Sequence, residues 1–125
     1  MEPGELIERA RAVLGEFRPS DGVAAGSAAA AILTADGHVY TGVCIDAACG
    51  LGFCAEHAAA AEMLKARESH VALVVAVSSA GPIAPCGRCR ELLWQLDARN
   101  RSAGVILGPD RVVPLAELLP EPWGG

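Results

Sequence analysis

Residues 71–77 read Val-Ala-Leu-Val-Val-Ala-Val, and this unbroken apolar run indicates the fold class. A strand with water on one face alternates apolar and polar residues, whereas a strand covered on both faces is apolar throughout. Before the run, residues 55–67 are good helix formers with abundant Ala. After it, a Gly-Pro loop leads to Leu residues at helical spacing over about 87–99. We therefore expect a strand buried inside a sheet, with a helix on each side of it in the sequence.

Two hairpins complete the predicted sheet. Apolar runs at 28–34 and 39–43 meet across Ala35-Asp36-Gly37-His38, and Asp-Gly between two such runs is a strong hairpin signal. Residues 105–107 and 112–113 form a second pair around a Gly-Pro-Asp turn. These four strands and the buried run give a roughly five-stranded sheet.

The remaining segments are predicted to be helices and connections. Apolar residues between Leu6 and Phe17 recur at helical spacing, and Pro19 stops that helix. Residues 20–27 are expected to form a connection, and 115–119 a short last helix. The order of elements predicts a three-layer α/β/α sandwich with a mixed sheet, in a single domain over residues 1–125.

Composition excludes several classes of protein. Hydrophobic residues make up 52% of the chain, which predicts a compact globule. A net charge of −5 and five aromatic residues argue against a nucleic-acid partner. The longest uncharged apolar run, 23–35, is too short and too rich in Ala to span a bilayer. The N-terminus lacks a signal-peptide pattern and the cysteine count is odd, so we expect reduced thiols in the cytoplasm.

Three cysteines have the spacing of a metal site. Cys54 precedes one predicted helix, while Cys86 and Cys89 form a Cys-x-x-Cys pair at the start of another. The N–H groups and the dipole at a helix N-terminus favour thiolate over thiol. Three thiolates suit Zn²⁺ and leave its fourth tetrahedral position open for water, as in a catalytic zinc site.

Glu56 follows Cys54 by two residues, which places it beside the metal without binding it. A carboxylate there can shuttle protons. Cys-x-Glu followed by Pro-Cys-x-x-Cys is the pattern of the zinc deaminases, in which water replaces an amine on a cytosine-type ring and ammonia leaves. Two other interpretations stay open: a non-catalytic zinc domain in which Cys49 is the fourth ligand, and a redox pair of Cys86 and Cys89.

The charge on three thiolates needs partial neutralisation. With Zn²⁺ the group carries a net charge of about −1, which weakens the metal as a Lewis acid. Arg90, directly after Cys89, is expected to donate to a ligand thiolate, whereas Arg88 is expected to face solvent.

From about Pro19 to Trp123 the sequence resembles the cytidine deaminase family, which includes the blasticidin S deaminases. The motifs that carry the resemblance are Leu33-Thr34-Ala35-Asp36-Gly37, Tyr40-Thr41-Gly42, Cys54-Ala55-Glu56, Pro85-Cys86-Gly87-Arg88-Cys89-Arg90 and Glu117-Leu118-Leu119-Pro120. The resemblance implies an α/β/α sandwich and a homotetramer (or dimer) with three-cysteine zinc sites near subunit interfaces. It also implies that the backbone N–H of Ala55 holds the pyrimidine carbonyl and that Glu56 hydrogen-bonds the ring.

The sequence departs from the family at positions that hold the sugar. Family members have Asn and Glu where this chain has Cys44 and Asp46, and the upstream Phe aligns with Gly26. Cys44 is a poor hydrogen-bond partner, while Asp46 keeps an acceptor on a shorter side chain. We therefore expect a deaminase of a cytosine-type nucleoside or nucleoside analogue, with weak activity on cytidine and a preference for a substrate that differs at the sugar. The alternatives are a blasticidin S-type antibiotic and another aminated heterocycle.

Other candidate residues have two interpretations each. His57 stands where the family often has an Arg that donates to the thiolates, and it is either such a donor or a core histidine. Trp123 stands where the family has an aromatic residue that reaches a neighbouring subunit's pocket. The alternative is that its side chain packs as a cover over the core of its own chain. Cys44 and Cys49 are most simply small buried hydrophobic residues.

Overall fold

The computed structural model describes residues 1–124. Its helices are α1 (Pro3–Arg11), α2 (Ala55–Lys65), α3 (Gly87–Leu96), the 3₁₀ helix η1 (Ala98–Ser102) and α4 (Leu115–Leu118). Its strands are β1 (Phe17–Ser20), β2 (Val23–Thr34), β3 (Val39–Asp46), β4 (Val71–Ser78), β5 (Gly81–Ile83), β6 (Gly104–Gly108) and β7 (Arg111–Pro114).

All seven strands belong to one mixed sheet, which confirms the predicted sheet type. The five predicted strands pair in the order β3-β2-β4-β6-β7, and β4 and β6 are parallel while the other pairs are antiparallel. β1 and β5 are short antiparallel additions to β2 and β4. As predicted from its apolar run, β4 lies inside the sheet, between β2 and β6.

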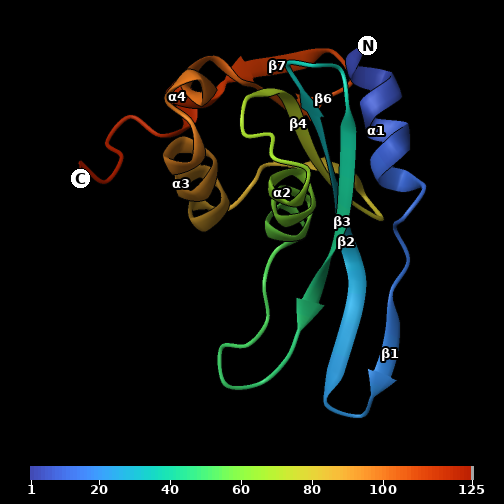
Figure 1. The fold of residues 1–125 in the computed structure, drawn as a ribbon. Helices are drawn as coiled ribbons and strands as arrows, with labels where there is room; N and C mark the ends of the chain where they lie inside the picture. Colours follow the sequence, from blue (N-terminus) through green and yellow to red (C-terminus); the bar gives the residue numbers. More distant parts are fainter. Residues whose placement is uncertain (125) are drawn as a thin grey trace.

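Helices cover both faces of the sheet, so the three-layer sandwich is confirmed (Figure 1). α1 packs on one face with Leu6 and Ile7, against buried residues of β2, β4 and β6. On the other face α2 and α3 pack side by side over a second core that includes Met63 and Leu93. The two clusters show that the sheet itself separates the cores.

Gly42 of β3 explains how closely α2 approaches the sheet. A Cβ atom added at this position would lie 2.5 Å from the backbone nitrogen of Ala59 and 2.6 Å from the Cβ of Ala58. Only glycine permits this approach, and the Ala-rich sequence of α2 provides the complementary small surface. The start of α2 is thereby held against β3.

The prediction for the N-terminal segment is wrong in part. The first helix ends at Arg11 instead of Phe17, and Phe17–Ser20 is a strand that pairs with the start of β2. β2 begins at Val23 within the predicted connection, with a bulge after Ala25. The cause is tertiary: Gly15 donates its N–H to the carbonyl of Gly26, a residue with φ +84°, at 3.0 Å.

The predicted end of the third helix also shifts. α3 ends at Leu96, three residues before Arg99, because Asp97 is extended and its side chain caps η1 by accepting the Arg99 N–H. A short polar side chain that accepts a backbone N–H offers an alternative to continuing a helix.

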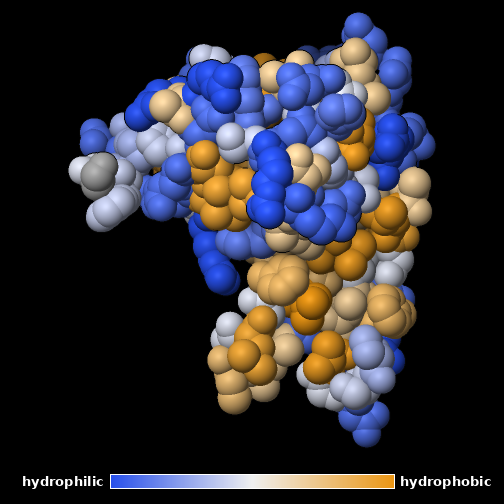
Figure 2. All heavy atoms as spheres, in the orientation of Figure 1, coloured by the Kyte–Doolittle hydropathy of each residue, from blue (hydrophilic) through white to orange (hydrophobic). Residues whose placement is uncertain are grey.

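The surface has a marked apolar region. Figure 2 shows it at the lower end of the molecule, over β1, the start of β2 and the loop that follows β3. Two strongly exposed apolar side chains, Phe17 of β1 and Leu51 of the loop, belong to these segments. None of the helices in residues 1–124 combines the length and the apolar character that a membrane crossing requires.

Candidate metal centre and active site

The three predicted ligands lie together at the N-termini of two adjacent helices. Cys54 and Cys86 are the N-cap residues of α2 and α3, and Cys89 lies in the first turn of α3. The Sγ atom of Cys86 is 3.5 Å from the Sγ atoms of both Cys54 and Cys89. All three sulfurs are within 4.8 Å of one another, a spacing that a single tetrahedral ion can bridge.

Hydrogen bonds to the backbone just before each ligand-bearing helix fix the starts of α2 and α3. Phe53 exchanges two backbone hydrogen bonds of 3.0 Å with Ile45 of β3, which anchors the chain just before Cys54. On the other side, the Arg90 Nε donates to the carbonyl of Pro85 at 2.8 Å, which anchors the chain just before Cys86. The ligand positions are therefore set by the sheet and by α3.

The chemistry of the donor set fits a cation. Burial and then the nearby Glu56 carboxylate raise the pKa of Cys89 far above its usual range. Burial, followed by the contact with Cys86, also raises the pKa of Cys54. For Cys86 burial opposes ionisation, but backbone N–H groups and the other two thiols outweigh it and lower the pKa. Three thiols this close ionise together only when a metal ion compensates their charge.

Glu56 lies in the first turn of α2 with 5% of its surface exposed. It lines a pocket of about 540 Å³ together with Cys54 and Cys86. The pocket's other lining residues come from β2, β3, the loop after β3, β5 and the segment after it, and the starts of α2 and α3: Ser27, Ala28, Cys44, Ile45, Asp46, Ala47, Gly50, Gly52, Phe53, Ala55, Ile83, Ala84 and Arg88. The pocket thus joins a buried carboxylate to the metal-ligand group.

His57 contacts the ligand group. Its Nδ1 lies 3.4 Å from the Sγ of Cys89. Burial, and then the positive charge of Arg88, lower the pKa of His57, which keeps the ring neutral at pH 7. A neutral ring with its proton on Nδ1 can donate to a thiolate, so the geometry favours the donor interpretation over a core histidine.

Arg90 does not make the contact that the sequence predicts. Its guanidinium donates to the carbonyl oxygens of Pro85 and, at 3.0 Å, Leu118. It ties the ligand segment to α4 instead of donating to sulfur. Arg88 instead lines the pocket, although its side chain is also exposed. Sequence reasoning missed this because the direction of a residue at a helix start depends on the neighbouring helix.

Cys44 and Asp46 both line the pocket, as does Ala55. Cys44 is buried, as predicted, and its sulfur lies 3.3 Å from both the Ser27 hydroxyl and the Ala28 backbone N–H. The thiol is therefore already engaged by the protein. Ser27 also lines the pocket, and no motif in the sequence predicts this.

Two other predicted residues lie away from the pocket. Trp123 is 69% exposed, so it is not a plug over its own core; its backbone N–H donates to Glu91 at 2.7 Å. Cys49 is exposed, contrary to the prediction of a small buried residue, and has a φ of 60°. Within residues 1–124, the group of metal-ligating side chains holds three cysteines, and Cys49 is not among them.

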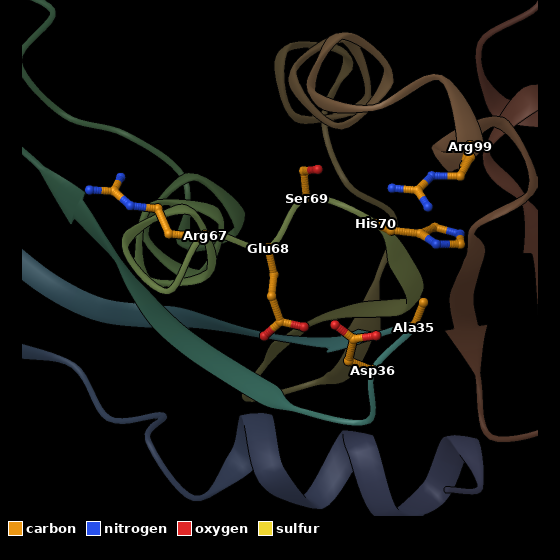
Figure 3. Close-up of a pocket in the computed structure, with 7 residues that line it drawn as sticks. All are labelled: Ala35, Asp36, Arg67, Glu68, Ser69, His70 and Arg99. Atoms are coloured by element: carbon orange, nitrogen blue, oxygen red, sulfur yellow. The ribbon is translucent and has the colours of Figure 1, made fainter.

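A second, smaller cavity of about 150 Å³ lies at the opposite end of the β2–β3 hairpin (Figure 3). Its lining combines the acidic Asp36 and Glu68 with Arg99, while Arg67 points away from the other side chains. Glu68 accepts hydrogen bonds from His38 and Tyr40, which join the hairpin to the segment after α2. We interpret this cluster as structural.

Comparisons with known proteins agree with the fold and the site. No family model matches the sequence. A cytidine deaminase from Halalkalibacterium halodurans is 34% identical over 95 residues, which cover 73% of this chain and 72% of that protein. The crystal structure of cytidine deaminase from Mycobacterium tuberculosis superposes with a TM-score of 0.83 at 26% identity, covering 100% of this chain and 99% of that one. Cytidine deaminase from Burkholderia pseudomallei gives a TM-score of 0.78 at 32% identity, covering 98% and 100%.

The fold and the three-cysteine site define a zinc-dependent hydrolase. With a relative of this identity and coverage, the chain belongs to the cytidine deaminase family. Cys54, Cys86 and Cys89 form the zinc site that is typical of the family.

Proposed function

We propose that the protein removes the amine from the cytosine-type ring of a nucleoside or nucleoside analogue by hydrolysis. The observation that carries this proposal is the buried Glu56 carboxylate in a pocket that also contains Cys54 and Cys86 of the zinc site. Hydrolysis replaces the ring amine with a carbonyl oxygen that comes from water, and the amine leaves as ammonia. Each turnover therefore needs protons to be taken from water and given to the ring nitrogen and to the amine.

Glu56 performs the proton transfers. It accepts a proton from the attacking water and passes it to the ring nitrogen. It then takes the second proton from the same oxygen and delivers it to the amine, so that the C–N bond breaks, the C=O bond forms and ammonia leaves. Zinc held by the three cysteines supplies a Lewis acid that activates water. The burial of Glu56 limits competition from bulk water for these protons.

The remaining pocket residues orient the substrate. The Ala55 backbone N–H, at the start of α2, holds the pyrimidine carbonyl, and Asp46 at the end of β3 accepts from a sugar hydroxyl. Because the Cys44 thiol is engaged by Ser27 and Ala28, Asp46 carries most of the polar contact to the sugar. His57 donates to the Cys89 thiolate and reduces the charge on the ligand group.

We also propose that the active form is a homotetramer or a dimer. The exposed Phe17 and Leu51 belong to β1 and to the loop after β3, two of the segments under the apolar surface region, and burial between copies would remove them from water. The exposed Trp123 is available to reach a neighbouring copy's pocket.

We also propose that the protein is cytoplasmic. All five cysteines are unpaired, which suits a reducing compartment.

Glu56→Gln tests the proposed function. The amide keeps the shape of the carboxylate but cannot accept and return a proton, so turnover should fall by about 10³ or more. Ammonia release should be measured with cytidine, deoxycytidine, cytosine, blasticidin S and aminated purine analogues. Zinc content and the thermal midpoint of the variant serve as controls for the fold. A variant with full zinc and a tenth of the wild-type rate would contradict the role of Glu56.

A structural zinc domain is the second candidate function. It predicts no ammonia release from any of these substrates and a metal site closed by a fourth protein ligand. The position of Cys49 outside the ligand group argues against it.

A further inference from the structure

Both tryptophans of the chain line one cavity that is separate from the active-site pocket. Trp94 of α3 and Trp123 of the C-terminal segment bound a space of about 470 Å³ together with Arg101 of η1. α3 and the C-terminal segment lie at the edge of the molecule opposite α1 (Figure 1). Within residues 1–124 this tryptophan cavity shares no lining residue with the active-site pocket. It is therefore a second place where a small molecule could bind.

The guanidinium of Arg101 is held in position by two contacts. Its Cζ lies 4.6 Å from the centroid of the Trp94 ring, and its Nη1 donates to the carbonyl of Ala98 at 3.0 Å. A cation–π contact of this kind uses the face of the guanidinium and leaves N–H groups at its edge for other partners. In residues 1–124 the arginine ion pairs are those of Arg11 and Arg99, and no acidic residue lines the cavity. The cavity thus has a fixed positive charge without a carboxylate partner.

Glu91 holds the C-terminal segment beside α3. Its Oε1 accepts the Trp123 backbone N–H at 2.7 Å, and its Oε2 accepts from the Gln95 Nε2 at 3.3 Å. The Trp123 side chain remains 69% exposed, whereas Trp94 is half-buried and packs against the core. Trp123 therefore offers an accessible aromatic surface on an anchored backbone, and Trp94 supports the charge of Arg101.

These groups define the chemistry of a ligand. A planar aromatic ring can stack on an exposed indole, and a carboxylate or phosphate can accept the N–H groups of a guanidinium. A volume of about 470 Å³ lies in the range of small-molecule sites, which is about 300–1,000 Å³. The net charge of the chain is −5, so an anion would be repelled by most of the surface and needs a local cation to bind.

We propose that the tryptophan cavity binds a small planar aromatic molecule that carries a carboxylate or a phosphate. Arg101 is the partner of the anionic group, and Trp123 is the partner of the ring. This inference is independent of the proposed deaminase function, because it uses none of the residues of the zinc site or the active-site pocket.

NMR spectroscopy of the isotope-labelled, zinc-loaded protein tests the inference, because both indole N–H groups of the chain lie in the cavity. The aromatic anions are naphthoate and naphthyl phosphate, which distinguish the two sources of negative charge. Naphthyl methanol has the ring without the charge, and cyclohexanecarboxylate has the charge without the aromatic ring. We expect at least one aromatic anion to shift both indole signals saturably. By calorimetry its affinity should exceed that of either matched probe by about tenfold or more, since both partners are engaged.

Variants assign the two contacts. Arg101→Gln should lower the affinity for the aromatic anion by about tenfold and leave that for naphthyl methanol unchanged. Trp123→Leu removes one indole signal and should weaken the binding of every naphthyl probe. Arg111→Gln removes a positive charge at an exposed position of β7 and should leave all affinities unchanged. Zinc content and the thermal midpoint of each variant serve as controls for the fold. Added salt should weaken the anionic probes alone, because Arg101 is exposed.

Three results would overturn the inference. The first is that neither aromatic anion moves the indole signals, as expected if a neighbouring copy covers the cavity or holds Trp123. The second is equal affinity for the charged and neutral naphthyl probes. The third is binding of the aromatic anion that persists unchanged in Arg101→Gln or in Trp123→Leu. None of these measurements depends on ammonia release, so the inference and the proposed function can fail separately.

Discussion

At the residue scale, Asn100 joins three parts of the chain through one amide. The residue has no exposed surface. Its Oδ1 accepts from the Val71 N–H at 2.8 Å, and its Nδ2 donates to the carbonyls of Ser69 and Leu93 at 3.0 and 2.9 Å. The start of β4 and the end of α3 are thus held together, which also fixes the helix that carries Cys86 and Cys89.

Asn100→Ala should destabilise the protein by about 3 kcal/mol, because three backbone groups, two of them buried, lose their partner and a small cavity forms. Urea unfolding measures the change. Gln95→Ala is the matched control at an exposed position of α3, and it should change the free energy of unfolding by less than about 0.5 kcal/mol. Equal losses in the two variants would show that the Asn100 network contributes little.

At the element scale, the contact between β3 and α2 places the start of α2, with Cys54 and Glu56, against the sheet. Gly42→Ala would put a Cβ atom 2.5 Å from the Ala59 nitrogen, so the helix or the strand must move. We expect a loss of about 1–3 kcal/mol of stability and reduced activity, because displacing α2 moves the proton-transfer group relative to the ligands.

Gly108→Ala provides the control for this prediction. Gly108 also lies in a strand, β6, but a Cβ atom there meets no other atom within 4 Å. Thermal unfolding and ammonia release should be close to wild type. If the two alanine variants behave alike, the close approach of α2 to β3 is not what sets the geometry of the site.

At the scale of the whole molecule, the metal links two helices on one face of the sheet. Purified protein should contain close to one zinc per chain, and chelation should lower the thermal midpoint by about 5 °C or more, since a ligand that binds only the folded state stabilises it. Cys89→Ser should lose the metal. Cys49→Ser should retain both the zinc and the midpoint, because Cys49 lies outside the ligand group. Loss of zinc in Cys49→Ser would instead indicate a closed, structural site.

Local sequence was sufficient for most of the fold and for the metal ligands. The strand at 71–77 was predicted from its continuous apolar residues, because burial on both faces selects residue type at every position. The ligands Cys54, Cys86 and Cys89 were predicted because thiolate chemistry and the spacing within a helical turn are both local properties. The strand β1 was not predicted, because it depends on a contact between Gly15 and Gly26 that no local pattern records.

Local sequence specifies the chemical groups for binding zinc and moving protons and places them at the starts of two helices. Which of the remaining side chains line the pocket depends on how the elements pack in three dimensions. Arg90 was expected at the thiolates and instead holds backbone carbonyls, while Arg88, expected in solvent, lines the pocket. The physical reason is that the direction of a long side chain at a helix start depends on what packs against that helix. Here α2 and α4 meet α3 from distant parts of the chain.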